Sequence, residues 1–406
     1  MVDKKHIRAY ALKNALEHDG KAVVGSVIAG LFNHGLQKSQ IKEIMPKIQD
    51  VLKEINSMSG QELEQEFAKL ESLIGHRVER DGLAELPGVK KGSVNTRMSP
   101  SPSGPLTLGH ILTIGPNYLY TKKYGGTFFI RIEDTNPENI DPKAYKMIKE
   151  ESKWLCDGNV KIVIQSERMD LYYKYAQKFI DKGAAYVCTC DVDAFKDLLL
   201  KKTGCPCRSL DKKEQKKRWK NMLDKDGYKQ GEAVLRFKSD ITHKNPAMRD
   251  FPLARINTTP HPKQKKKYRV WPLMNLAVPV DDIEMKMTHI IRGKDHMDNS
   301  KRQKMMYKAL GKEKQYPWVA FIGRLHFTDF VMSTSKMRKA IEEGKYSGWD
   351  DPKLPTVVSL KNKGYCPEAF WKYVEQRGVS ETDKTISQKD FFQLIDNFEK
   401  DLKRDK

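Results

Sequence analysis

The sequence predicts an α/β protein in which a Rossmann-like parallel sheet is split by an α+β insertion and flanked by helical modules at both ends. The first observation is a strand, turn, helix and strand unit between residues 97 and 134, with polar side chains after its strands. The second is a helical repeat of apolar positions near both termini. The third is a run of short strands and paired cysteines that interrupts the sheet pattern.

These patterns divide the chain into consecutive parts. Residues 1–90 are predicted to be a helical appendage, 91–187 and 266–340 the two halves of the sheet domain, 188–265 the insertion, and 341–406 a helical C-terminal module. In the appendage, which should be helical throughout, Ser59 and Glu62 predict a capping box. Pro46 should kink the third helix or shift its start, and the charged tail 400–406 should fray.

The unit at 97–134 shows its boundaries most clearly. A turn rich in Ser, Pro and Gly runs into a helix, and Gly125-Gly126 ends this helix where a positive φ is needed. Residues 127–132 are predicted to form a strand that is followed by Glu133 and Asp134. A phosphate-bearing ligand would meet free N–H groups at the helix start near Gly109. Taken alone, this unit indicates a nucleotide site only weakly.

Later segments also have clear patterns. A helix is predicted at 170–184, a strand at 232–238 in the insertion, and a strand at 318–327 in the second half of the sheet. Helices are predicted at 367–378 and 390–402 near the C-terminus.

Composition narrows the class of protein. Among 406 residues, Lys and Arg outnumber Asp and Glu by 74 to 53, a net charge of +21. This excess favours a polyanionic partner such as nucleic acid, although adaptation for solubility is the alternative. No stretch approaches the ~18 apolar residues of a membrane span, and the N-terminus lacks the apolar core of a signal peptide. We therefore expect a cytoplasmic protein without membrane association, whose six cysteines are reduced or bind a metal.

Several long segments of the sequence, which occur in the same order, resemble one family. Residues 102–110, PSGPLTLGH, resemble the first signature of class I aminoacyl-tRNA synthetases, and residues 331–336, VMSTSK, resemble the second. The words NPAMRDFPLARI (245–256), YRVWPLMN (268–275), THIIRGKDHMDN (288–299) and STSKMRKAIEEGKYSGWDDPKLPT (333–356) resemble the archaeal-type glutamyl-tRNA synthetases. The resemblance runs from end to end of the chain. It implies ATP-dependent activation of glutamate and its transfer to the 3′ end of tRNA, with ATP and Mg²⁺ as the cofactor pair.

The resemblance also implies roles for individual residues. It places Arg97, Glu133, Met274 and Arg292 in the glutamate pocket, where Arg292 would pair with the side-chain carboxylate and so favour glutamate over glutamine. It places Ser101, Gly104, Gly109, His110, Ser333, Ser335 and Lys336 on the ATP phosphates. Thr107, His110 and Lys336 stand at the catalytic positions of the two signatures.

The chain departs from the family pattern at several positions. Thr107 replaces the first histidine of the first signature, Val331 and Thr334 replace lysines of the second, and Met274 replaces a tyrosine of the pocket wall. Loss of one preorganised donor can reduce a rate by about 100-fold or more. Two alternatives to an active synthetase therefore stay open: a catalytically degenerate paralog that binds tRNA or a protein, and an enzyme with a changed acceptor.

The insertion and the chain end add two expectations about partners. Cys188, Cys190, Cys205 and Cys207 form a CxC…CxC array that can hold a structural Zn²⁺, with reduced structural thiols as the alternative. By resemblance the insertion binds the tRNA acceptor arm. The family's β-barrel domains, which read the anticodon, find no match here, so we expect a truncated relative or a protein partner that supplies anticodon recognition. Cys156 and Cys366 are more typical of core positions.

Overall fold

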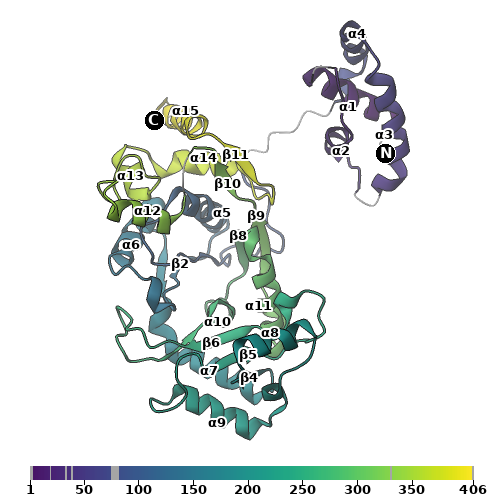
Figure 1. Cartoon of the computed structure of the whole chain (residues 1–406). Helices are drawn as coiled ribbons and strands as arrows, with labels where there is room; N and C mark the ends of the chain where they lie inside the picture. The colour runs from purple at the N-terminus through teal and green to yellow at the C-terminus, as the bar shows by residue number, and fades with distance from the viewer. Residues whose placement is uncertain are drawn as a thin grey trace. The chain divides into compact units, whose positions relative to one another are not determined.

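The computed structural model describes residues 3–18, 20–32, 34–37, 40–74, 82–329 and 332–404. The chain separates into two compact units, residues 1–80 and 81–406 (Figure 1). Each unit has its own apolar core and is described by itself.

The N-terminal unit is a helical bundle. Its helices are α1 Lys4–Glu17, α2 Val24–Phe32, α3 Ile41–Ile55 and α4 Gly60–Leu70. The predicted capping box is confirmed, since the Ser59 side chain accepts from the Glu62 backbone and the Glu62 side chain accepts from Ser59 N. Pro46 lies inside α3, which begins before it at Ile41. The prediction of helix throughout 1–90 is wrong for residues 82–90, where Gly82 and Gly88 have positive φ and the backbone turns.

The second unit is built on parallel strands. These are β1 Thr96–Met98, β2 Phe128–Ile132 and β3 Lys161–Ile164 in one sheet, and β8 His289–Gly293 with β9 Trp318–Ile322 in another. The two sheets meet where Thr288 N and His289 N donate to Asn95 O, immediately before β1. Helices α5 Leu108–Tyr124, α6 Ala144–Leu155, α10 Met274–Glu284 and α11 Met297–Ala309 accompany these strands. The predicted parallel α/β layer is confirmed.

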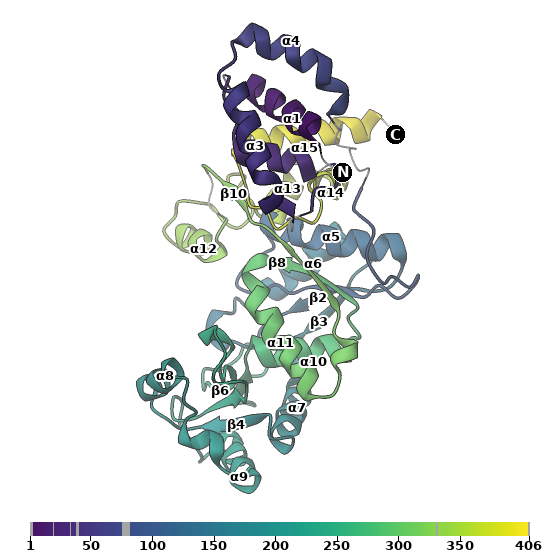
Figure 2. The same ribbon diagram turned by 90° about the vertical axis from the view of Figure 1, so that its right-hand side faces the viewer.

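An antiparallel sheet interrupts the parallel layer, and its strands are β4 Ala185–Cys188, β5 Val234–Phe237, β6 Pro252–Ile256 and β7 Val270–Pro272. The insertion therefore extends beyond the predicted bounds 188–265, because β4 begins before residue 188 and β7 lies after residue 265 in the same sheet. Helices α7 Met169–Asp181, α8 Val192–Leu200 and α9 Lys212–Leu223 accompany it. The predicted helix at 170–184 and strand at 232–238 are thus confirmed. Figures 1 and 2 show this sheet at one end of the second unit and α12 to α15 at the other.

The C-terminal helices pack on the parallel layer. They are α12 Thr334–Glu342, α13 Val357–Asn362, α14 Pro367–Arg377 and α15 Gln388–Arg404. Trp371 and Val374 of α14 lie against Gly115 of α5, where an added Cβ would stand 2.7 Å from Val374. The helices predicted at 367–378 and 390–402 are confirmed. The frayed tail is wrong as far as Arg404, because α15 continues to that residue.

One predicted strand is broken. Residues 318–327 form β9 and a separate strand, β10 Leu325–Phe327, which pairs in parallel with β11 Lys384–Ile386. The chain turns at Gly323, whose N–H donates to Ser380 O. A Cβ at Gly323 would stand 2.2 Å from Thr382 O, so this turn needs glycine. In the part of the chain that the structure describes, no helix has the length and apolar character of a membrane span.

The turn after α5 yields a stability prediction. Gly126 has φ +140°, and an added Cβ would stand 2.3 Å from Val94 O. Gly158 also has positive φ, +73°, but nothing lies within 4 Å of its added Cβ. Gly158→Ala should cost about 1–2 kcal/mol for the left-handed backbone alone. Gly126→Ala should cost clearly more, because it adds a clash with the backbone. Urea unfolding of both variants measures the difference, and equal losses would contradict the role given to the clash.

Candidate active site

A cavity of about 260 Å³ lies at the carboxyl ends of β1, β2 and β8. Its lining includes residues that follow these strands, the first turn of α5 and the start of α10. They are Arg97, Met98, Ser99, His110, Thr113, Glu133, Met274, Ile291, Arg292, Gly293, Asp295 and His296. This is the edge at which parallel α/β sheets bind ligands. Predicted residues from distant parts of the sequence, among them Arg97, Glu133, Met274 and Arg292, therefore share one cavity.

The first signature forms the N-terminal cap of α5. Thr107 is the N-cap residue, and its backbone N–H donates to His110 Nδ1 at 2.9 Å. Because Nδ1 accepts this bond, the ring proton of neutral His110 lies on Nε2. Desolvation by the surrounding protein lowers the pKa of His110 to about 4, so the ring is a neutral donor near pH 7. Thr107 is buried and is not among the residues that line the cavity.

Arg97 is held by a buried carboxylate from the other half of the domain. Its Nε and one terminal nitrogen donate to the two oxygens of Asp282 at 2.9 and 3.0 Å. Arg131 donates to the same carboxylate at 2.6 Å and lies 3.4 Å from Glu133. Burial by itself would raise the pKa of Asp282, but the charges of Arg97 and Arg131 outweigh it and lower the pKa to about 2. Asp282 is therefore ionised and fixes the direction of both guanidinium groups.

Arg292 has a different environment. Its side chain is 6% exposed and donates to Gln303 Oε1 at 2.9 Å, with Ser300 Oγ at 3.4 Å. Its Nε has no hydrogen-bond partner, and no ion pair with a carboxylate is formed among the described residues. Burial, and then the like charge of Arg97, lower the pKa of Arg292 to about 10, which still leaves it charged near pH 7. Arg292 is thus a buried cation that lines the cavity and has no carboxylate partner among the described residues.

Glu133 and Met274 also line the cavity. The Glu133 side chain is 17% exposed and follows β2, whereas Met274 is the first residue of α10. Glu133 accepts from Arg131 at 3.4 Å. Met274 contributes a thioether side chain and lacks the hydroxyl group of the tyrosine that the resemblance leads us to expect.

The two signatures touch each other. An added Cβ on Gly109 would stand 3.0 Å from Met332, and one on Gly104 would stand 2.7 Å from Thr334. Ser333 caps α12, its hydroxyl accepts from Lys336 N at 3.5 Å, and it lies 3.1 Å from the Ser335 hydroxyl. Ser335, Lys336 and Ser101 are exposed. Val331 lies outside the described residues. The structure brings the signatures together at the edge of the cavity, whose lining includes His110 of the first signature.

The cysteines of the insertion form one cluster. The sulfurs of Cys188, Cys190, Cys205 and Cys207 all lie within 4.8 Å of one another. Cys188 and Cys205 are 3.9 Å apart, and Cys190 and Cys207 are 3.7 Å apart. A zinc tetrahedron with Zn–S bonds of ~2.3 Å places its sulfurs about 3.8 Å apart. Arg218 donates to the Cys207 sulfur at 3.3 Å, a charge that favours a thiolate. The geometry therefore fits a zinc ion.

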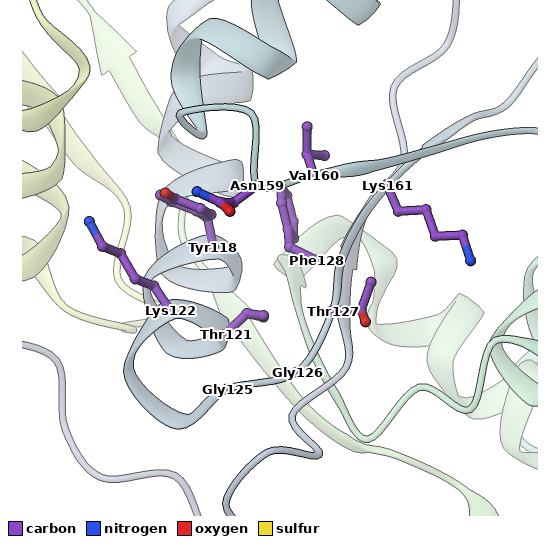
Figure 3. Close-up of a pocket in the computed structure, with 10 residues that line it drawn as sticks. All are labelled: Tyr118, Thr121, Lys122, Gly125, Gly126, Thr127, Phe128, Asn159, Val160 and Lys161. Atoms are coloured by element: carbon purple, nitrogen blue, oxygen red, sulfur yellow. The ribbon is translucent and has the colours of Figure 1, made fainter.

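A second cavity, of about 440 Å³, lies at the opposite edge of the sheet. Figure 3 shows that it is formed by the end of α5, the turn at Gly125-Gly126 and the starts of β2 and β3, with Lys122 and Lys161 pointing apart. It contains no residue of either signature. Although it is larger, the chemistry lies in the cavity that contains Arg97, His110 and Arg292.

Sequence reasoning missed several residues of the site. Asp295 and His296 line the cavity, and Asp281 and Asp282 hold the arginines behind it. His296 Nδ1 lies 3.2 Å from Asn299 Nδ2, and burial followed by the charge of Arg292 lowers its pKa to about 4. The adjacent acidic pair in VDD (280–282) and the word RGKDH (292–296) were the available signals.

A parallel sheet split by an antiparallel insertion, with two touching signatures beside a cavity at the strand ends, defines a nucleotide-dependent class I synthetase domain. The family of class I tRNA synthetases (E and Q), catalytic domain, matches residues 93–400. The chain belongs to this family of glutamate- and glutamine-type class I tRNA synthetases.

Its similar proteins include archaeal ligases. The chain is 41% identical over 391 residues to the glutamate–tRNA ligase of Methanothermobacter thermautotrophicus, a match that covers 95% of this chain and 69% of that protein. It is 40% identical over 406 residues to that of Methanocaldococcus jannaschii, covering 99% and 72%. The crystal structure of a glutamate tRNA ligase from Elizabethkingia meningosepticum in complex with its amino acid matches with TM-score 0.54 and 21% identity, covering 75% of this chain and 68% of that one. This last likeness concerns the fold alone.

Proposed function

We propose that this protein is a glutamate–tRNA ligase, which joins glutamate to the α-phosphate of ATP and then transfers it to the 3′-terminal ribose of tRNA. The observation that carries this proposal is Arg292, a buried cation that lines the cavity and has no carboxylate partner among the described residues. A ligand carboxylate would satisfy its charge and its free Nε. A neutral amide would leave that charge uncompensated, which is the physical basis for choosing glutamate over glutamine.

The other pocket residues complete a socket for an amino acid. We assign Glu133 to the α-ammonium group, because it is the acidic side chain that lines this wall of the cavity beside the strand end. Arg97 keeps one terminal nitrogen that does not bond to Asp282, and we assign this nitrogen to a ligand carboxylate. Met274 supplies an apolar wall. A fixed socket lowers the barrier by holding the glutamate carboxylate in line with the phosphate.

We assign the two signatures to ATP. Ser101, Gly104, Gly109 and His110 surround the start of α5, whose N–H groups and dipole favour phosphates. Ser333, Ser335 and Lys336 stand at the start of α12 and contact the first signature through Met332 and Thr334. When bound, Mg²⁺ would neutralise charge on the phosphates, and the chain's own groups orient them. His110 donates from Nε2 without adding charge, so Lys336 is the cation of the signatures.

The remaining assignments concern the partner and the compartment. We propose that the tRNA acceptor arm binds the insertion, whose helix α9 carries the lysines Lys212, Lys213, Lys216, Lys217 and Lys220. Lysine side chains on one element supply the electrostatic part of nucleic-acid binding. ATP, glutamate and tRNA are substrates of cytoplasmic translation, which is the compartment that we propose.

The function is tested by ATP–pyrophosphate exchange, with and without tRNA. The protein should support exchange with glutamate and much less with glutamine. Arg292→Met should raise the KM for glutamate by at least about 10-fold, because a hydrogen bond to a charged group is worth roughly 1.5–3 kcal/mol. Arg404→Met, at an exposed position of α15, is the matched control and should leave exchange unchanged. Equal use of glutamine, or an Arg292→Met variant with wild-type KM, would overturn the assignment.

A second candidate, a degenerate paralog that binds tRNA without activating glutamate, is favoured by Thr107. This side chain is buried, lies 3.2 Å from His110 Nδ1, and brings neither charge nor a donor into the cavity. Absence of exchange under every condition, together with retained tRNA binding, would support this candidate.

Thr107→His distinguishes a weakened enzyme from one that is organised around threonine. The longer side chain would restore a donor beside the phosphates, and we expect kcat of exchange to rise by about 10-fold or more with little change in KM, as for a contact that strengthens in the transition state. Thr113→Ser, a conservative change at a threonine that lines the cavity, is the control. An unchanged or lower kcat would contradict the prediction.

For the cysteine cluster we propose one structural Zn²⁺ per chain, held by Cys188, Cys190, Cys205 and Cys207. Elemental analysis of protein that is purified without added zinc should give a ratio near one. A strong chelator should lower the thermal stability of the insertion. Cys190→Ser should release the metal, whereas Cys366→Ser should not. A metal-free protein with unchanged stability would contradict the proposal.

A further inference from the structure

Glu151 is a buried acid outside the cavity that the proposed mechanism does not use. It lies on α6 and is 7% exposed. Its Oε2 accepts from the backbone N–H of Leu106 at 2.6 Å. Leu106 immediately precedes Thr107, whose own N–H donates to His110 Nδ1. A side chain of α6 therefore contacts the loop of the first signature one residue before its helix cap.

The same loop is tied to a second segment, residues 355–358. Val357 N donates to Leu106 O at 2.9 Å, and Leu108 N donates to Pro355 O at 2.8 Å. Thr107 and Thr356 form an isolated antiparallel bridge. The backbone N–H of Val358, in the first turn of α13, lies close enough to favour the charged form of Glu151, whereas Glu151 Oε1 has no hydrogen-bond partner. One carboxyl group thus faces N–H groups of both segments at the place where they join.

Among the described residues, no cation compensates this carboxyl group. Burial raises the pKa of Glu151 to about 8, although the N–H groups of Leu106 and Val358 oppose the shift, and the like charge of Glu150 adds to it. Residues 102–108 and 355–358, which face it, contain no titratable side chain. Near pH 7 the group is mostly neutral, and it becomes charged in a buried place as the pH rises through 8. A buried acid without a cation is costly, so its position indicates a role other than stability.

We propose that Glu151 is a positioning residue, which holds the loop of the first signature against the start of α13 and so keeps His110 at the cavity wall. The proposal rests on the proposed function, since the loop positions the activation site. Removal of the carboxyl group frees Leu106 N and loosens the junction. His110 then loses its fixed orientation, which lowers kcat more than it changes the KM for glutamate.

The test uses Glu151→Leu and Glu151→Gln in the full chain, with Lys153→Gln, exposed on the same helix, as the control. Hydrogen–deuterium exchange reports on the peptides that cover 104–110 and 355–358 without needing activity. Glu151→Leu should speed exchange of these amides at least tenfold and lower kcat of pyrophosphate exchange about tenfold or more. Glu151→Gln should keep both at wild-type values at pH 7, since it is neutral and retains an acceptor.

The pH profile supplies the readout that a purely structural role would not move. The neutral acid is the form favoured in the folded protein, so the free energy that holds the junction falls as the pH rises from the ordinary glutamate pKa of 4.5 to about 8, and above about pH 8 the buried group itself is charged. Wild type should lose kcat above about pH 8, and Glu151→Gln should lack this decline.

Wild-type amide exchange in Glu151→Leu, or the same alkaline decline in Glu151→Gln, would overturn the proposal. If Glu151→Leu does not fold, the profile of Glu151→Gln decides alone. Faster amide exchange in Glu151→Leu from a chain without any activity would support the anchoring and overturn the proposed function instead.

Discussion

The ion pair between Arg97 and Asp282 joins the two halves of the sheet domain across 185 residues of sequence. Arg97 lies in β1, before the insertion, and Asp282 lies in α10, after it. Both side chains are buried, so loss of Asp282 would leave the charge of Arg97 uncompensated in a low-dielectric interior. Arg131 of β2 binds the same carboxylate, which brings a second strand into the arrangement. The strand ends therefore keep their relative places even though an independent sheet is inserted between them.

This network also determines the charge that remains for a ligand. Asp281 accepts from Arg168 at 2.7 Å, from Gln165 and from Tyr172, while Asp282 is shared by Arg97 and Arg131. Both aspartates are thus occupied behind the cavity. Arg292 stands on the cavity side, and its partners among the described residues, Gln303 and Ser300, are neutral. The buried acids orient Arg97, Arg131 and Arg168, and Arg292 keeps its charge uncompensated by them. In the function that we propose, this division is the basis of selectivity for an acidic amino acid.

How far the sequence predicted the molecule depends on the range of the interactions. The capping box at Ser59 and the helix end at Gly125 depend on a few neighbouring residues, and both were predictable. The strand at 318–327 was wrong because its break at Gly323 depends on contact with Thr382, far along the chain. The roles of Asp281 and Asp282 were not predicted, because they depend on contacts with side chains from three separate elements. The cavity residues were identified because they lie in long segments that resemble the family. The aspartates that bind the arginines of the cavity were not identified.

The site combines buried side chains that are held by hydrogen bonds with an exposed side chain, Lys336, of the second signature. Arg97, Glu133 and Arg292 lie at strand ends and are oriented by buried partners. His110 is fixed through its Nδ1 by the cap of its own helix, and its low pKa makes it a donor without charge. The phosphates of ATP carry several negative charges, which a neutral donor and backbone N–H groups cannot balance. In the function that we propose, the compensating cation within the two signatures is Lys336, whose side chain is exposed at the start of α12. On that proposal, amino-acid choice depends on the buried side chains at the strand ends, while charge compensation of the nucleotide depends on the contact of Met332 with Gly109 that brings the second signature to the first.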